Sequence, residues 1–361
     1  MLPENVMSDL ISRLPVKTII RCKCVCKKWR DLVTDPYFVH LHLSRSHEAL
    51  MMHDGLGFRR PGTLKWVEII HDQLIPVKRL HLRRCGPVRG FSRIQVGSVN
   101  GLICCVDHEY EQRIYIFNPV LEEYMILPKP RSGGAGLETL GYGFGVSTAG
   151  KYKVIRICGR MKYLYTSKTV VYSAEIEVYN LGMDHWRSLG QTPCNLKGLL
   201  SPGLYLTSHM YWLDDGQIYD LDLVRETFEL FPSPAARGGK ERMLGVLKGS
   251  LSCVSWCLLG LEVWVVKEGS WYKEISVQEV VSPFLKSRVW RPVCLVDGLE
   301  GASILLVYVE VTRKLMVYRL NTNTIQNLYL PAFWPNRISH RNECLGYRPS
   351  FVKLDSIGST R

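Results

Sequence analysis

The sequence predicts an α+β multidomain protein, in which three short N-terminal helices precede an all-β, propeller-like domain of about six blades. Apolar residues recur at helical spacing before residue 38 and at alternating, strand-like spacing from about residue 60 onward. One hairpin pattern then recurs five times, which indicates units that need neighbours to bury their faces. We therefore expect two domains, at residues 1–45 and 46–361.

The first expected helix begins at Pro3, where the missing N–H of proline costs nothing. Val6, Leu10 and Leu14 then recur at four-residue spacing and form one apolar stripe. Pro15 ends this helix, because its ring disfavours helical geometry in the preceding residue.

Two shorter helices are expected next. Val16 and Ile20 belong to the second, while Val25 and Trp29 belong to the third, which we expect to stop at Pro36. Fewer than about 40 residues seldom bury enough surface to be stable alone. Since we expect no partner helix elsewhere in the chain, this segment should bury its apolar face against another protein. A self-sufficient helical subdomain is the alternative.

The order of residues in this segment resembles the F-box, over about residues 2–44. The matching letters are Leu2-Pro3, Leu14-Pro15-Val16, Arg21, Val25-Cys26-Lys27-Lys28-Trp29-Arg30 and Pro36-Tyr37-Phe38. Cys22 departs from the pattern, because many members have an aromatic residue there. The resemblance implies docking on the Skp adaptor of cullin-based ubiquitin ligases. We expect the adaptor-binding residues to be Leu2, Pro3, Leu10, Leu14, Pro15, Val16, Ile20, Val25 and Trp29.

The second region repeats one hairpin pattern. Four alternating residues are followed, ten positions after the first of them, by another large apolar residue, with turn formers between the two. The first strands are Ile114–Phe117, Ile176–Tyr179, Ile218–Leu221, Leu261–Trp264 and Leu315–Tyr318, and the second strands carry Tyr124, Trp186, Phe228, Trp271 and Ile325. Starts 42 to 62 residues apart, with further strands before each hairpin, indicate propeller blades.

Three further features complete the expected ring. A sixth, weaker unit begins at about Leu64. The stretch Leu345–Leu354 should return to pair near Ala49–Met52, which would close the ring and cover its edges. Extra length before Ile176 predicts a loop insertion at about Gly159–Lys168.

Several phrases in this region resemble the F-box-associated, kelch-like interaction domain of plant F-box proteins. They are Val99-Asn100-Gly101-Leu102-Ile103, Phe117-Asn118-Pro119, Leu127-Pro128, Gly141-Tyr142-Gly143-Phe144, Tyr152-Lys153-Val154, Val178-Tyr179-Asn180, Trp186-Arg187 and Met210-Tyr211-Trp212. The resemblance implies a domain that recruits a target protein, whose identity it does not give. Loop aromatics are the better candidates for target binding, and we select Phe333 and Trp334, which lie between two prolines.

The charge and the cysteines argue against several classes of function. The net charge of +13 is spread along the chain rather than gathered in a basic stripe, so we do not expect nucleic acid as a partner. The densest basic stretch, Lys78–Arg84, leaves recognition of an acidic target open. The 12 cysteines include no Cys-x-x-Cys pair, and the histidines show no metal spacing, so we expect reduced thiols, no metal and no cofactor.

We find no residues in a catalytic pattern. The stretch Gly145–Lys151 has the spacing of a phosphate loop, but Tyr152 stands where serine or threonine would hold magnesium. The expected function is therefore that of a non-enzymatic substrate receptor, which reaches cullin through the Skp adaptor. The alternatives are an F-box scaffold outside a ligase, a propeller enzyme or carbohydrate-binding protein, and a nucleic-acid-binding protein.

The sequence also bears on the compartment. No run of about 18 apolar residues is present, and no secretory leader is recognisable at the N-terminus. We expect no membrane contact and an intracellular location, in the nucleus and/or cytoplasm.

Overall fold

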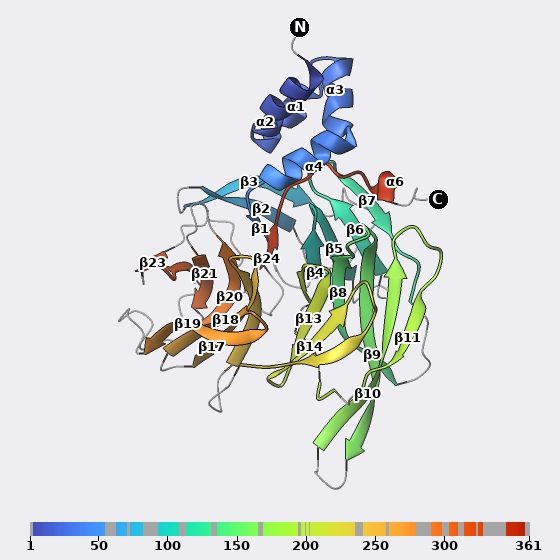
Figure 1. The fold of residues 1–361 in the computed structure, drawn as a ribbon, viewed down its shortest axis with the longest axis vertical. Coiled ribbons are helices and arrows are strands. Elements are labelled where there is room, and N and C mark those ends of the chain that lie inside the picture. Colours follow the sequence, from blue (N-terminus) through green and yellow to red (C-terminus); the bar gives the residue numbers. More distant parts are fainter. Residues whose placement is uncertain are drawn as a thin grey trace.

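A bundle of short helices lies at one end of a ring of β-sheets (Figure 1). The computed structural model describes residues 3–54, 63–70, 73–81, 93–107, 113–130, 136–164, 169–193, 196–198, 200–201, 203–234, 241–257, 260–278, 290–297, 303–309, 314–322, 324–327 and 344–357. No helix in these ranges is long and apolar enough to cross a membrane.

The helical segment contains four helices rather than the predicted three: α1 (Glu4–Ser12), α2 (Val16–Cys22), α3 (Lys27–Thr34) and α4 (Pro36–Arg45). The third helix ends at Thr34, before Pro36, as expected, but Pro36 is also the first residue of α4, which was not predicted. Asp35 caps this helix, and its Oδ1 accepts hydrogen bonds from the backbone N–H groups of Tyr37 at 2.8 Å and Phe38 at 3.4 Å. The segment therefore has a partner helix of its own.

The strands form six four-stranded antiparallel sheets, which are the blades of a propeller. The first blade combines β24 (Cys344–Tyr347) with β1 (Ala49–Asp54), β2 (Thr63–Ile70) and β3 (Gln73–His81). The second contains β4 (Arg93–Val99), β5 (Leu102–Asp107), β6 (Arg113–Asn118) and β7 (Glu123–Ile126). The third contains β8 (Leu137–Val146), β9 (Tyr152–Leu164), β10 (Thr169–Asn180) and β11 (Arg187–Gln191).

The remaining blades follow the same order. The fourth contains β12 (Leu204–Leu206), β13 (His209–Asp214), β14 (Gln217–Asp222) and β15 (Phe228–Phe231). The fifth contains β16 (Glu241–Leu247), β17 (Ser250–Cys257), β18 (Gly260–Lys267) and β19 (Ser270–Gln278), and the sixth β20 (Trp290–Asp297), β21 (Ser303–Val309), β22 (Lys314–Arg319) and β23 (Thr324–Asn327). A short helix, α6 (Leu354–Ile357), follows β24.

The predicted repeat and ring closure are confirmed. Each of the five predicted hairpins is the outer strand pair of a blade, and the weaker unit at Leu64 supplies β2 and β3. The late strand β24 pairs antiparallel with β1, with Ala49 opposite Tyr347 and Met52 opposite Cys344. The sheet built from both ends of the propeller sequence thus closes the ring.

The predicted loop insertion at Gly159–Lys168 is corrected in part. Residues 159–164 continue β9, and they pair with β10 as far as Leu164 opposite Thr169. β-branched and aromatic residues such as Val170, Val171 and Tyr172 favour strands over a loop. The result is a long hairpin, defined here as residues 159–164 and 169–174, which projects from the end of the propeller opposite the helices (Figure 1).

Side chains in the motifs that resemble the plant interaction domain make contacts between segments that lie far apart in the sequence. The Trp212 indole N–H donates to the carbonyl of Tyr142 at 2.9 Å, which links the third and fourth blades. A Cβ at Gly143 would lie 2.7 Å from the Trp212 ring, so only glycine leaves room for the indole. Asn118, fully buried, donates to the carbonyls of Ser350 at 3.0 Å and Val352 at 2.7 Å. These motif residues therefore stabilise the packing of the fold.

Candidate docking face of the helical segment

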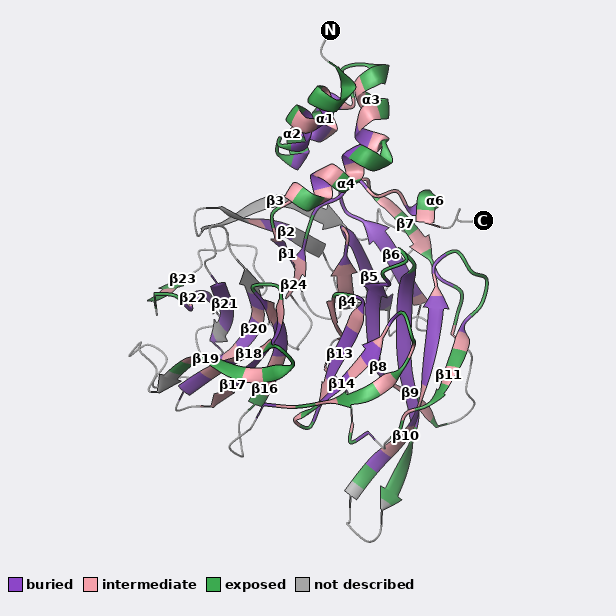
Figure 2. Ribbon diagram, in the orientation of Figure 1, coloured by how far each residue is buried: buried purple, intermediate pink, exposed green. Residues whose placement is uncertain are grey.

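One side of the helical segment packs inward. Ile11, Val16, Ile19 and Val33 are buried in a single apolar cluster, which also contains Phe38 of α4 and residues of the first two blades. This cluster packs the helices against the propeller. Figure 2 shows the buried and exposed residues that alternate along them.

The other side carries aliphatic residues that the fold does not cover. We define the docking face as Val6, Leu10, Leu14 and Val25, all of which are exposed. Val6 and Leu10 are four residues apart on α1 and therefore share one side of that helix. Leu10 is 49% exposed and Val25 is 65% exposed, which is unusual for large aliphatic side chains that a helical core could have buried.

The structure divides the predicted adaptor-binding residues into groups. Leu10, Leu14 and Val25 are exposed, as are Pro3 and Pro15, which immediately precede α1 and α2. Ile20 and Trp29 are half-buried and pack on the apolar cluster. Leu2 lies outside the described residues.

Val16 was predicted to take part in docking, but only 6% of its surface is exposed. It is the first residue of α2 and belongs to the buried cluster, so its side chain contributes to the core of this chain. Spacing alone could not show this, because α4 was missing from the expected segment.

Ionic contacts hold α1 against α4. The Arg45 guanidinium donates to Asp9 Oδ1 and to Ser12 Oγ, both at 2.6 Å. Arg13 also binds Asp9, at 3.2 Å. The hydrogen bond from Arg13, together with that from Arg45, lowers the pKa of the Asp9 carboxyl, which therefore stays ionised near neutral pH.

Aromatic rings and one hydroxyl fix α4 on the propeller. The His42 ring lies 5.0 Å from the Phe351 ring and 6.2 Å from the Phe38 ring, between centroids. Ser46 donates to the carbonyl of Pro349 at 2.9 Å. Burial lowers the pKa of His42 from 6.5 to about 4, so this side chain is neutral at physiological pH.

A second surface feature was not predicted from the sequence. A groove of about 620 Å³ lies between α1, α3 and the start of α4, and Tyr37 at its edge is largely exposed. Its lining is mostly polar, and Lys28 pairs with Glu4 across it at 3.3 Å. The residues that line it are Glu4, Asn5, Ser8, Lys27, Lys28, Asp31, Leu32, Asp35 and Tyr37.

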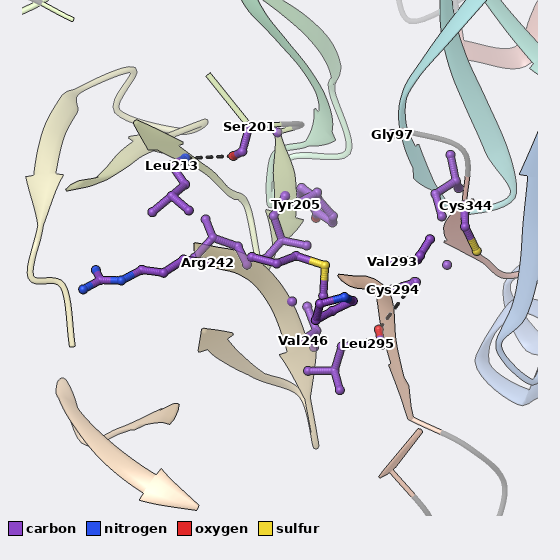
Figure 3. A pocket seen from close by; sticks show the side chains of 18 of the residues that line it. Gly97, Ser201, Tyr205, Leu213, Arg242, Val246, Val293, Cys294, Leu295 and Cys344 are labelled. Carbon is purple, nitrogen blue, oxygen red and sulfur yellow. Dashed lines mark hydrogen bonds between the residues drawn. The ribbon is translucent and has the colours of Figure 1, made fainter. Parts of the chain in front are cut away.

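The propeller contains a cavity of about 280 Å³ where the first strands of several blades converge (Figure 3). Its wall combines aliphatic side chains, among them Leu213, Val246, Val293 and Leu295, with charged residues such as Arg242. The Ser201 hydroxyl accepts a hydrogen bond from the backbone N–H of Leu213 at 2.8 Å and is thereby occupied. None of the predicted site residues that the structure describes lies in this wall.

The described residues contain no cluster suited to a metal ion, and two of their buried thiols are protonated. Within these ranges, no three His, Cys, Asp or Glu side chains are grouped so that they could hold a metal ion. Burial raises the pKa of Cys158 to about 11 and that of Cys253 to about 12, so these thiols stay protonated and act as small hydrophobic residues. Gly145–Lys151 forms the end of β8 and a turn before β9, in which the N–H of Ser147 donates to the carbonyl of Lys151 at 3.0 Å.

The predicted target-binding residues Phe333 and Trp334 lie outside the described residues. Part of the basic stretch Lys78–Arg84 falls in β3, and the rest lies outside the described ranges. Their assignment to target binding stays a prediction.

Comparisons with known proteins agree with this architecture. The F-box domain family matches residues 1–41, and the F-box associated beta propeller domain family matches residues 70–354. An F-box protein of Arabidopsis thaliana is 28% identical over 341 residues, which cover 85% of this chain and 79% of that protein. An F-box/kelch-repeat protein of the same plant is 27% identical over 337 residues, which cover 82% of this chain and 84% of that protein.

Among solved structures, an oligogalacturonate lyase from Vibrio parahaemolyticus covers 81% of this chain and 82% of its own, with a TM-score of 0.45 at 8% identity. This similarity is low.

The family matches span both regions of the molecule in the order that the structure has them. The chain therefore belongs to the F-box associated beta propeller family and carries an F-box domain at its N-terminus.

Proposed function

We propose that this chain is the substrate-recognition subunit of a cullin-based ubiquitin ligase. The F-box docks on a Skp-family adaptor and reaches cullin through it, while the kelch-like propeller recruits a target protein for ubiquitination. The chain contributes no catalytic residue and no cofactor to the transfer. It acts inside the cell, in the nucleus and/or cytoplasm.

The docking face is the observation that carries this proposal. The buried side of the F-box is already covered by α4 and the propeller, yet Leu10, Leu14 and Val25 stay exposed. Exposed aliphatic groups of this kind are stabilised when a partner removes them from water. An adaptor that covers them accounts for their position.

The rigid junction between the two regions supports the same function. His42, Phe38 and Phe351 fix α4 on the propeller, so an adaptor bound to the F-box and a target bound to the propeller lie at a set distance. Tethering of this kind raises the effective concentration of the target near the transfer machinery. A flexible linker between the two regions would give a less defined geometry.

The test is adaptor binding by a double variant, Leu10→Ser with Leu14→Ser. Loss of central apolar contacts costs about 2 kcal/mol or more in typical interfaces, so we expect affinity for a purified Skp-family adaptor to fall at least about thirtyfold. The matched control is Val224→Ser with Leu230→Ser, since both residues are 53% exposed but lie on the fourth blade. Equal affinity of the two double variants would refute the docking assignment.

A second assay separates a ligase subunit from an F-box scaffold. The complex of chain, adaptor and cullin is supplied with ubiquitin and the activating enzymes, and ubiquitin on the chain's own lysines is measured. Cullin-dependent modification is the expected result. Adaptor binding without any transfer would favour the scaffold.

A further inference from the structure

Two free cysteines flank the most exposed residue of the docking face. Val25 is 65% exposed, and Cys24 and Cys26 on either side of it are exposed as well, in the turn that joins α2 to α3. The other free cysteines of the described ranges are buried or half-buried. A reagent that attacks thiols of the folded chain therefore meets Cys24 and Cys26 first, and we call these two residues the thiol pair.

The two thiols differ in their hydrogen bonds. The Cys24 thiol donates to the carbonyl of Ile20 at 3.9 Å. Cys26 is the N-cap residue of α3, and its side chain makes no capping hydrogen bond with that helix. An anionic group attached to Cys26 would also lie at the positive end of α3, where negative charge is favoured. We therefore expect Cys26 to react before Cys24.

The surroundings of the thiol pair are basic. Three basic side chains of residues 21–27 form no ion pair within the part of the chain that the structure describes, and that segment contains no Asp or Glu; they are Arg21, Lys23 and Lys27. Two carboxylates of the groove beside Lys27 are already paired, Glu4 with Lys28 at 3.3 Å and Asp31 with Arg30 at 3.7 Å. The local charge therefore attracts an anionic reagent.

We propose that the thiol pair is a modification site for a small anionic disulfide, and that its modification prevents the adaptor from binding. This inference rests on the proposed function, because it assigns a control to the docking face. The Cys26 thiolate attacks one sulfur of the disulfide, so that a bond forms between Cys26 Sγ and that sulfur while the S–S bond of the reagent breaks. The leaving thiolate takes up the proton that Cys26 releases, and no other oxidant is needed.

The adduct occupies the place that the adaptor needs. A peptide such as glutathione carries carboxylates, and next to Val25 it would cover an apolar side chain with charged groups that are costly to bury. An adaptor that is already bound covers the thiols in turn. Modification and docking therefore exclude each other, and a reductant that removes the adduct should restore docking.

The test uses the full chain, with glutathione disulfide as the probe. Peptide mass spectrometry should locate glutathione on Cys26 or Cys24, and affinity for a purified Skp-family adaptor should fall at least about tenfold and recover in dithiothreitol. The variant Cys24→Ser with Cys26→Ser should keep its affinity after the same treatment. The matched control is Cys257→Ser with Cys294→Ser, because these half-buried cysteines lie on the fifth and sixth blades. This control should lose affinity as the unaltered chain does.

The order of addition and the charge of the reagent sharpen the same test. The complex of chain and adaptor should take up glutathione at least about tenfold more slowly than the free chain, because the thiols are covered. Lys23→Gln with Lys27→Gln should slow the reaction of the free chain with glutathione disulfide but not with uncharged bis(2-hydroxyethyl) disulfide. Equal slowing with both reagents would indicate a structural effect and overturn the charge argument.

The remaining outcomes separate this proposal from the proposed function. Modification of the thiol pair with unchanged adaptor affinity, glutathione on other cysteines instead, or an internal disulfide between Cys24 and Cys26 would each overturn the modification proposal alone. If the adaptor fails to bind the untreated chain, the proposed function falls, whatever the thiols do.

Discussion

In the six blades, aliphatic residues of the strands such as Ile116, Ile155 and Leu305 are fully buried, whereas in the helices Leu10 and Leu14 remain in contact with solvent. Both regions show clear apolar periodicity in the sequence. Each blade is flanked by two others because the ring closes, so both faces of each sheet are covered. The helices have neighbours on one side only. The comparison shows that periodicity identifies an apolar face, while the number of neighbours decides whether the fold covers it.

The difference in burial between the two regions can be tested by truncating one apolar side chain in each of them. Trp212→Ala removes a fully buried indole that joins two blades, and should lower the free energy of unfolding by about 3–5 kcal/mol. Leu10→Ala should change it by less than about 0.5 kcal/mol, because the side chain is exposed. Urea denaturation measures both. A comparable loss in the two variants would mean that the docking face contributes to the core.

The junction between the regions gives the next effect. His42 has a pKa of about 4 in the folded chain and 6.5 when unfolded, so the unfolded state takes up a proton first as the pH falls. Stability should therefore decline between about pH 6.5 and pH 4, by up to about 3 kcal/mol from this group. His42→Gln should flatten the decline in urea midpoints measured across this range. An unchanged slope would contradict the assignment.

The smallest effect concerns the start of α4, where the helical region meets the rest of the chain. Asp35→Ala removes the acceptor for two backbone N–H groups and should cost about 1 kcal/mol of stability. Asp35→Asn keeps an acceptor oxygen and serves as the control. Thermal unfolding of the two variants distinguishes the cap from the charge, and equal losses would assign the effect to the charge.

Much of the fold could be predicted because the repeat is local. The ten-residue offset between Ile114 and Tyr124, and its four repetitions, is the length of one hairpin, and each was found. The return of Leu345 to the first blade was also predicted, since an open ring would leave sheet edges exposed.

The fourth helix was missed because proline has two effects on helices. Pro36 stops a helix when it follows one, but Asp35 before it makes an N-cap and starts another. Val16 fits a docking residue by spacing, yet it is buried in the cluster that includes Phe38 of α4. Part of the long hairpin was missed because its strand residues were taken for a loop. Target-binding surfaces depend on which faces stay uncovered, and that is a property of the assembled ring.

The pairing of β24 with β1 also determines when the F-box acquires its support. The first blade and α4 rest against Tyr347, Pro349 and Phe351, which follow the N-terminal helices by about 300 residues. A truncated or still-growing polypeptide that stops before residue 344 lacks both the fourth strand of that blade and the aromatic ring beside His42. Synthesis must therefore pass residue 351 before the N-terminal helices can make these contacts, although the helices leave the ribosome first.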